Sequence, residues 1–178
     1  PAGAHRFKVE IRELNEWYQR QLANLRVEIH LNTEMDAEKI AALKPDAVVF
    51  GIGSSAVMPR VPGIDHPKAV SCVDVLLGKR QLGNNVIVVG GGLVGCEIAY
   101  EALLDGKKVS VVEGLPEILS SGAPVPHQSK SFLKEMFSAK AVPVYTNTFL
   151  AGVNDDGVIV KSRNSREEQV LNRSYRHA

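Results

Sequence analysis

Apolar residues recur at helical spacing near the start of the chain. Between residues 8 and 25 they repeat every three or four positions among charged residues, a pattern that predicts an amphipathic helix. Its aromatic pair, Trp17 and Tyr18, is expected in the core or at its edge. A short second helix is predicted over 37–43 with Asp36 as its N-cap, because an aspartate side chain accepts hydrogen bonds from the unpaired N–H groups of a first turn.

Two short apolar runs in the same part of the chain predict strands. Residues 27–31 alternate between apolar and polar types, and residues 47–50 read Ala-Val-Val-Phe. The first 55 residues therefore resemble half of a doubly wound α/β domain that lacks its opening strand and helix. Residues 56–82 are rich in proline and predict an irregular crossover linker with one short helix at 73–77.

The chain from residue 83 to residue 178 predicts a second α/β unit. Two β-branched runs, 86–90 and 109–113, flank an apolar helical segment at 93–105, which is the pattern of a strand–helix–strand unit. The same reasoning predicts the elements that follow, which are helix 127–139, strand 142–145 and the strands of a β-meander at 149–153, 157–161 and 169–171. The fold class expected is α/β, with a parallel sheet plus a β-meander.

A glycine-rich loop joins the first strand of this unit to its helix. It reads Gly90-Gly91-Gly92-Leu93-Val94-Gly95, which matches G-x-G-x-x-G in the strand–turn–helix context of a Rossmann-like dinucleotide-binding site. The first glycine permits a sharp turn, the second a close approach of pyrophosphate, and the third tight packing of the helix. The free N–H groups at the helix start favour phosphate.

An acidic residue completes the pattern at the end of the second strand. Glu113 follows Gly95 by eighteen residues, close to the separation of about twenty at which a carboxylate binds the adenosine ribose hydroxyls. A carboxylate repels a 2′-phosphate, and residues 114–117 contain no arginine to bind one. NAD(H) is therefore expected to be preferred over NADP(H).

Composition narrows the partners and the compartment. The formal net charge of +1 over 178 residues offers no basic field for nucleic acid. No apolar run approaches the roughly twenty residues that span a membrane, and no signal segment opens the chain, so a cytoplasmic protein that avoids membranes is expected. The partners expected are a small-molecule dinucleotide and the rest of a longer chain, and a homo-oligomer stays open.

The cysteines and histidines do not predict a metal site. The two cysteines are distant in sequence and the five histidines are scattered. Cys96 falls in the first turn of the helix that follows the glycine loop, where either a low-pKa thiolate or a small packing residue is conceivable. Packing is the favoured interpretation, and no residue of the chain is assigned a catalytic role.

Four segments resemble one family of flavoproteins. The first, residues 90–97, is similar to its GGG-x-x-G-x-E loop, and residues 46–54 to a strand and turn, although the family's Ala-Thr-Gly is Gly51-Ile52-Gly53 here. Residues 59–65 and 73–79 resemble a P-x-x-P-G-x-D crossover and a D-V-L-x-G-K helix. The chain resembles the nucleotide-binding region of two-dinucleotide flavoprotein reductases, most closely the NADH:flavin oxidoreductases of the 2,4-dienoyl-CoA reductase and 2-enoate reductase family.

This resemblance implies a domain plan and further site residues. Residues 1–55 would belong to an FAD-binding domain, 56–82 to the crossover and 83–178 to an NAD(P)H-binding domain truncated at its C-terminus, so the chain is expected to be a fragment. In the intact protein Gly51 and Gly53 would approach FAD. Glu97 would bind the nicotinamide carboxamide, or else merely favour the helix dipole.

The resemblance also implies a function for the intact protein. NADH would give a hydride to FAD, and electrons would pass through an iron–sulfur cluster and FMN, both upstream, to an enoate or dienoyl-CoA acceptor. A disulfide or ferredoxin reductase of the same architecture and a non-catalytic nucleotide-binding module stay open as alternatives. The isolated fragment is expected to be inactive because it cannot hold both the donor and the flavin.

Overall fold

A computed structural model of the chain describes residues 2–122, 124–165 and 167–172. It contains a short 3-10 turn at the start, five helices and six strands in the described residues. In chain order these are η1 (Ala2–Ala4), α1 (Val9–Asn24), α2 (Ala37–Leu43), α3 (Cys72–Leu76), β1 (Asn85–Val89), α4 (Leu93–Leu104), β2 (Lys108–Val112), α5 (His127–Ala139), β3 (Val144–Tyr145), β4 (Thr148–Val153), β5 (Gly157–Ser162) and β6 (Glu168–Asn172).

A parallel sheet of β1, β2 and β3 confirms the predicted strand–helix–strand unit. The β-branched residues of β1 and β2 pair in register, from Asn85 opposite Lys108 to Val89 opposite Val112. Strand β3 is shorter than predicted and pairs only through Val144 and Tyr145. Proline explains the shortening, because Pro143 has no N–H to give to the ladder.

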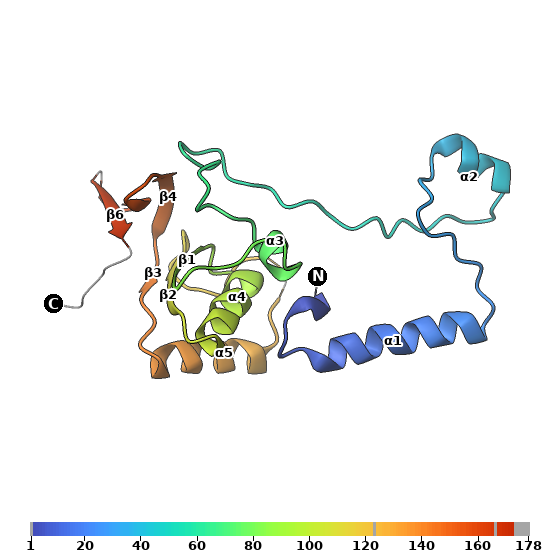
Figure 1. Cartoon of the computed structure of the whole chain (residues 1–178), viewed down its shortest axis with the longest axis horizontal. Coiled ribbons are helices and arrows are strands. Elements are labelled where there is room, and N and C mark those ends of the chain that lie inside the picture. Colours follow the sequence, from blue (N-terminus) through green and yellow to red (C-terminus); the bar gives the residue numbers. More distant parts are fainter. Residues whose placement is uncertain (1, 123, 166, 173–178) are drawn as a thin grey trace.

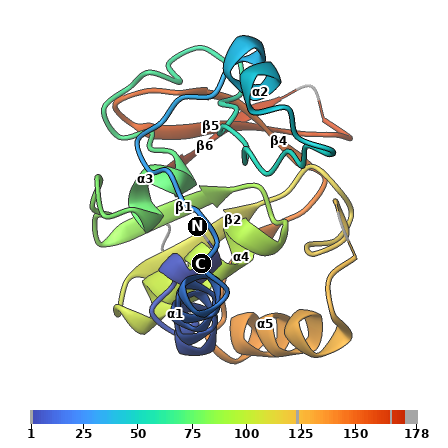
Figure 2. The ribbon, with the colours of Figure 1, turned by 90° about the vertical axis from the view of Figure 1, so that its right-hand side faces the viewer.

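Helices α4 and α5 cover one face of this sheet and the β-meander covers the other (Figure 2). Burial alternates along β2, since Val111 belongs to the cluster under the helices and Val112 to the cluster under the meander. The helix side is filled by residues from both helices, which include Cys96, Ala99, Ala102, Leu133 and Phe137. The resulting arrangement is the predicted α/β class in three layers.

Strands β4, β5 and β6 form the predicted antiparallel meander. A register shift between Leu150 and Gly152 bends β4, as a β-bulge does. The turn between β4 and β5 forms because the side chain of Asn154 accepts hydrogen bonds from the N–H groups of Asp156 and Gly157, both at 3.0 Å. Val160 and Leu171 bury the meander against Val112.

The first part of the chain extends away from the sheets (Figure 1). Helices α1 and α2 are confirmed, and Asp36 caps α2 by accepting a hydrogen bond from the N–H of Lys39 at 2.8 Å. No residue of either helix is buried. The expectation that Trp17 and Tyr18 lie in or beside the core is wrong, because their exposed fractions are 46% and 52% and no described element covers that face.

The strands predicted at 27–31 and 47–50 are wrong. Residues 27–30 and 47–50 form no strand and Leu31 lies in a turn, and Ile29 and Val49 are 53% and 95% exposed. A strand is stabilised by hydrogen bonds to a neighbouring strand, and none of the described residues lies beside these segments as a ladder partner. Their sequence pattern is therefore insufficient without a second strand.

The crossover between the two parts is anchored on the meander. The N–H of Val153 donates to the carbonyl oxygen of Pro62 at 2.9 Å, and Lys68 Nζ donates to the carbonyl oxygen of Asp155 at 2.7 Å. Gly63 sits at a φ of +72°, and a Cβ on it would lie 1.9 Å from the carbonyl oxygen of Val153. The predicted short helix in this segment appears as α3, capped by Ser71.

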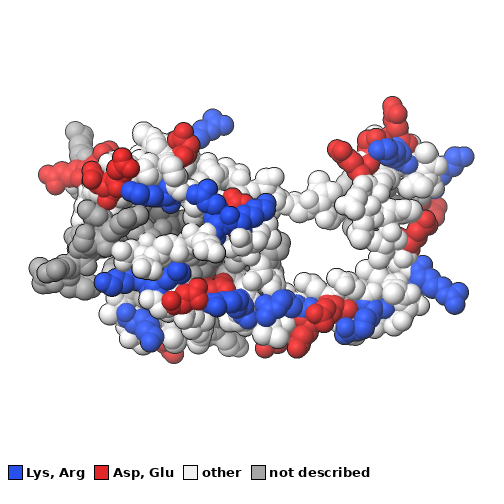
Figure 3. All heavy atoms as spheres, viewed as in Figure 1, with Lys and Arg blue, Asp and Glu red and all other residues white. Residues whose placement is uncertain are grey.

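Charge is mixed over the surface. On the face in Figure 3, basic and acidic side chains are interspersed and neither sign forms a continuous field. None of the helices in the described part of the chain is both long enough and apolar enough to cross a membrane.

We predict that Gly63→Ala destabilises the fold by about 1–3 kcal/mol, because alanine meets both an unfavourable φ and a backbone oxygen. Thermal unfolding followed by circular dichroism measures the change. Gly83→Ala is the matched control, because a Cβ at Gly83 meets nothing within 4 Å. Equal melting temperatures for the two variants would show that the Pro62–Val153 contact does not restrain the fold.

The thiol of Cys96 is packed rather than reactive. Its side chain is fully buried, and burial, followed by the negative charges of Glu113 and Glu97, raises the pKa of Cys96 to about 12. The low-pKa thiolate is therefore wrong and the packing interpretation is confirmed. Cys72, the other cysteine, is exposed.

We predict that iodoacetamide at pH 8 labels one thiol per folded chain and two after unfolding, since only a thiolate reacts and Cys96 stays protonated. Mass spectrometry of the labelled peptides identifies the site. Cys72→Ser should remove labelling of the folded protein, and rapid modification of Cys96 in that variant would contradict the buried position.

Candidate functional site

The glycine loop turns sharply where β1 ends. Gly90 has a φ of +105°, a conformation that side chains other than glycine rarely adopt. Its N–H donates to the carbonyl oxygen of Val112 at 2.8 Å, so the turn is tied to the end of β2. Helix α4 begins at Leu93, with Gly92 as its N-cap.

The start of α4 presents several backbone N–H groups that have no partner. The first hydrogen bond of the helix runs from the N–H of Cys96 to the carbonyl oxygen of Gly92 at 3.0 Å. The N–H groups before it, those of Gly92, Leu93, Val94 and Gly95, donate to no group in the described residues. Such groups, together with the positive end of the helix dipole, favour a bound anion.

Gly92 and Gly95 differ in the space around them. A Cβ on Gly95 would lie 1.9 Å from the carbonyl oxygen of Gly90, whereas one on Gly92 would meet only Ser121 Oγ at 3.5 Å. Gly95 thus lets α4 pack closely on the turn. A Cβ on Gly92 would make only an ordinary contact, so this position leaves room beside the start of the helix.

Glu113 lies at the carboxyl end of β2, directly beside the loop. Its side chain is buried, with 8% of the residue exposed. Oε2 accepts a hydrogen bond from the N–H of Gly91 at 2.6 Å, and Oε1 accepts one from the N–H of Leu115 at 2.8 Å. These two hydrogen bonds hold the loop in place. A carboxylate has about four acceptor positions, so Glu113 can accept further hydrogen bonds.

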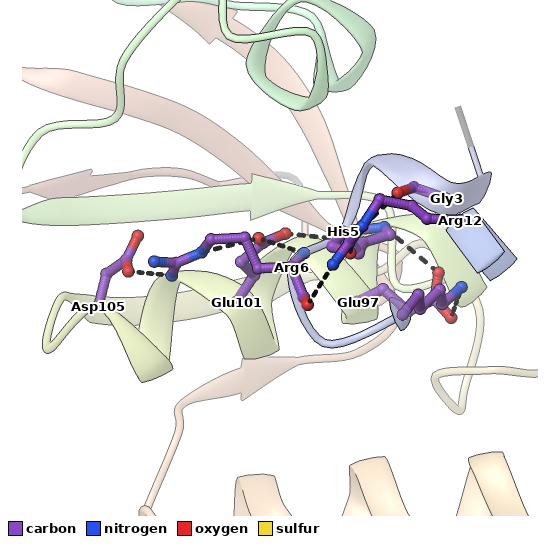
Figure 4. A network of polar contacts seen from close by, with 8 residues as sticks. Gly3, His5, Arg6, Arg12, Glu97, Glu101 and Asp105 are labelled. Atoms are coloured by element: carbon purple, nitrogen blue, oxygen red, sulfur yellow. Dashed lines mark hydrogen bonds and ion pairs between the residues drawn. The ribbon is translucent and has the colours of Figure 1, made fainter. Parts of the chain in front are cut away.

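Glu97 lies in the second turn of α4, and the first turn of that helix contains no acidic residue. Its carboxylate forms an ion pair with Lys8 Nζ at 2.5 Å and lies 3.4 Å from His5 Nε2 (Figure 4). The alternative that Glu97 merely favours the helix dipole from the first turn is therefore wrong. The structure instead shows a contact with residues more than eighty positions earlier in the chain, which the sequence analysis missed.

A segment of the N-terminal part, residues 5–8, continues this contact along α4. The imidazole of His5 is 2% exposed, and its Nδ1 lies 2.7 Å from Glu101 Oε2. The backbone N–H of Arg6 donates to Glu101 Oε1 at 3.0 Å, and the guanidinium forms ion pairs with Glu101 and Asp105. The spacing of four residues between the acids of α4 was the signal that could have indicated an acidic face.

The contacts of Glu101 determine its ionisation. Burial is the largest influence and by itself raises the pKa of Glu101, but the hydrogen bond from the Arg6 backbone, the hydrogen bonds from His5 and the Arg6 side chain, and the positive charge of His5 outweigh it. The pKa of Glu101 is therefore held below its usual value. This carboxylate remains charged in the contact with residues 5–8 at neutral pH.

Gly51 and Gly53 are not brought to the glycine loop. They lie in the extended run between α2 and α3, which Figure 1 shows away from the sheets. A Cβ on either glycine would meet nothing within 4 Å. Among the described residues no group of His, Cys, Asp or Glu has the arrangement of a metal site.

The sequence matches a known protein family and resembles known proteins over most of its length. The sequence pattern of the family described as pyridine nucleotide-disulphide oxidoreductase matches residues 11–173. A cinnamate reductase of Clostridium sporogenes is 34% identical over 172 residues, which is 97% of this chain and 25% of that protein. An NADH oxidase of Thermoanaerobacter brockii is 35% identical over 158 residues, which is 85% of this chain and 24% of that protein.

Comparison with solved structures agrees with the fold. A 2-naphthoyl-CoA reductase in complex with 2-naphthoyl-CoA aligns with a TM-score of 0.80 and 25% identity, covering 96% of this chain and 25% of that one. The chain thus spans about a quarter of the length of these relatives. Because the family pattern extends over most of its residues, the chain belongs to the pyridine nucleotide-disulphide oxidoreductase family, which has a Rossmann-like fold that binds FAD and NAD.

Proposed function

We propose that this chain is the electron-donor binding region of a longer flavin-dependent oxidoreductase, and that residues 90–95 hold the pyrophosphate of NADH. The observation that carries the proposal is the set of four N–H groups at the start of α4, from Gly92 to Gly95, that have no partner in the part of the chain that the structure describes. A Cβ on Gly92 would meet only Ser121 Oγ, at 3.5 Å, so this glycine leaves room for a ligand beside them, and such groups favour a diphosphate.

Glu113 is proposed to bind the adenosine ribose. Its carboxylate is anchored at the loop by the N–H groups of Gly91 and Leu115, so its position relative to the phosphate site is rigid. The acceptor positions that remain suit the ribose hydroxyls, and the negative charge disfavours a 2′-phosphate. This supports NADH as the preferred donor.

Glu97 is proposed to lie at the nicotinamide end and to accept a hydrogen bond from the carboxamide. Lys8 and His5 hold its carboxylate in place, which limits the positions it can take. When bound, the nicotinamide supplies the hydride, and the residues of the chain bind the cofactor, orient it and exclude water. No side chain of the described residues is assigned a proton transfer.

The described residues do not form a matching site for FAD. Gly51 and Gly53 lie on exposed extended chain, and no second glycine-rich helix start accompanies them in the described ranges. FAD binding, and the FMN and iron–sulfur cluster expected upstream, therefore belong to the longer protein. The resemblance to a cinnamate reductase and to a 2-naphthoyl-CoA reductase supports an unsaturated acid or acyl-CoA as the final electron acceptor.

We predict that Gly92→Ala keeps the melting temperature within about 2 °C but lowers NADH affinity roughly tenfold, because its methyl group has room in the fold and obstructs the phosphate. Gly95→Ala should instead destabilise the protein, since its Cβ meets a backbone oxygen. Calorimetric titration with NADH and thermal unfolding measure the two effects. Undiminished NADH binding by Gly92→Ala would place the dinucleotide elsewhere.

We predict that Glu113→Ala weakens NADH binding about tenfold, because the hydrogen-bond acceptor for the ribose is lost. The difference in affinity between NADH and NADPH should also become smaller, because the charge that repels the 2′-phosphate is removed. Titration of each nucleotide gives the two dissociation constants. Glu117→Ala is the control, since that carboxylate lies on the same loop but is half exposed and ion-paired with Lys130 and Lys134. Unchanged NADH affinity in Glu113→Ala would refute the ribose assignment.

A further inference from the structure

A shallow pocket opens on the meander close to the end of β2. It has a volume of about 590 Å³ and is lined by Phe149, Lys161, Ser162, Arg163, Asn164 and Ser165. None of these residues was singled out by the sequence analysis. The pocket is formed by the start of β4 and by the end of β5 with the turn that follows it.

The pocket is physically joined to the loop that carries Glu113. The N–H of Thr148 donates to the carbonyl oxygen of Glu113 at 2.9 Å, and the N–H of Asn147 donates to that of Leu115 at 3.0 Å. The first residues of β4 therefore run alongside residues 113–115. Phe149 lies so close to Gly114 that a Cβ on this glycine would be 2.6 Å from the ring.

Arg163 extends over this ring. Its guanidinium carbon lies 5.4 Å from the centroid of Phe149, which is a cation–π contact. The N–H of Arg163 donates to the carbonyl oxygen of Asn147 at 2.7 Å, so the turn after β5 is fixed to the same strand start. The backbone bond thus fixes the turn, and the ring contact orients the guanidinium on a phenylalanine that itself lies against Gly114.

The positive charges of this pocket have no acidic partner among the residues that the structure describes. Lys161 pairs across the ladder with Phe149 on one side and with Glu168 on the other, yet neither Lys161 nor Arg163 takes part in an ion pair with the described residues. An arginine whose donors are free is suited to bidentate recognition of phosphate.

We propose that Arg163, held on Phe149, is a specificity residue that binds a 2′-phosphate on the adenosine ribose, so that NADPH is accepted beside NADH. This rests on the proposed function, because Glu113 must mark the ribose. Residues 114–117 contain no arginine that could bind a 2′-phosphate. Arg163, in the turn after β5, would take this role instead. Glu113 favours the free hydroxyl, Arg163 favours the phosphate, and the preference for NADH is consequently reduced.

The test uses ADP-ribose and 2′-phospho-ADP-ribose, two probes that differ only in the 2′-phosphate. In calorimetric titrations of the chain, Arg163→Gln should weaken binding of 2′-phospho-ADP-ribose roughly three- to tenfold and binding of ADP-ribose by less than about twofold. Lys108→Gln is the matched control, because Lys108 is exposed at the opposite end of β2 and should leave both affinities unchanged.

The variant Arg163→Lys shows whether the effect of Arg163→Gln comes from the lost charge or from a damaged fold. It keeps the cation but not the planar stacking, so it should fold as the wild type and retain part of the affinity for the phosphorylated probe. If Arg163→Gln weakens binding of both probes equally, or of neither, Arg163 does not bind the 2′-phosphate. Failure of the wild type to bind either probe, or binding that Gly92→Ala leaves intact, refutes the proposed function instead.

Discussion

The hydrogen bond from the N–H of Gly91 to the carboxylate of Glu113 is the contact on which the site depends. A buried carboxylate is costly unless its oxygens are paired, and this one accepts from Gly91 and Leu115. The carbonyl oxygen of Gly91 in turn accepts from Leu119 N–H and Cys96 Sγ. Because the groups of Gly91 are satisfied inside the protein, the loop is held in place, whereas the N–H groups from Gly92 to Gly95 have no partner among the described residues.

Helix α4 also links the site to the N-terminal part of the chain. Glu97, Glu101 and Asp105 follow one another at intervals of four residues, and like charges at this spacing destabilise an isolated helix. His5, Arg6 and Lys8 lie against this acidic face and form ion pairs with it. The same contact that balances the charge of α4 therefore also holds Glu97, so that the position of this side chain depends on residues 5–8.

The sequence correctly predicted those elements whose formation depends on residues within the element itself. Helices α4 and α5 and the meander were predicted because hydrophobic periodicity, glycine stops and turn residues lie within the segments themselves. The strands predicted at 27–31 and 47–50 did not form, because a ladder needs a partner that no pattern within the segment supplies. For the same reason, the burial predicted for Trp17 and Tyr18 on the apolar face of α1 is not observed, because no described element covers that face.

The sequence by itself determined the strand–glycine loop–helix unit and its acidic residue, because each of its requirements is local: glycine where φ is positive, no Cβ where the backbone must approach closely, and a carboxylate at a strand end. Only the tertiary structure decided what surrounds it. It brought His5 and Lys8 to Glu97, Arg163 to Phe149, and Phe149 to Gly114. These partners are separated by 14 to 92 residues, and packing and strand pairing, not spacing along the chain, bring them together.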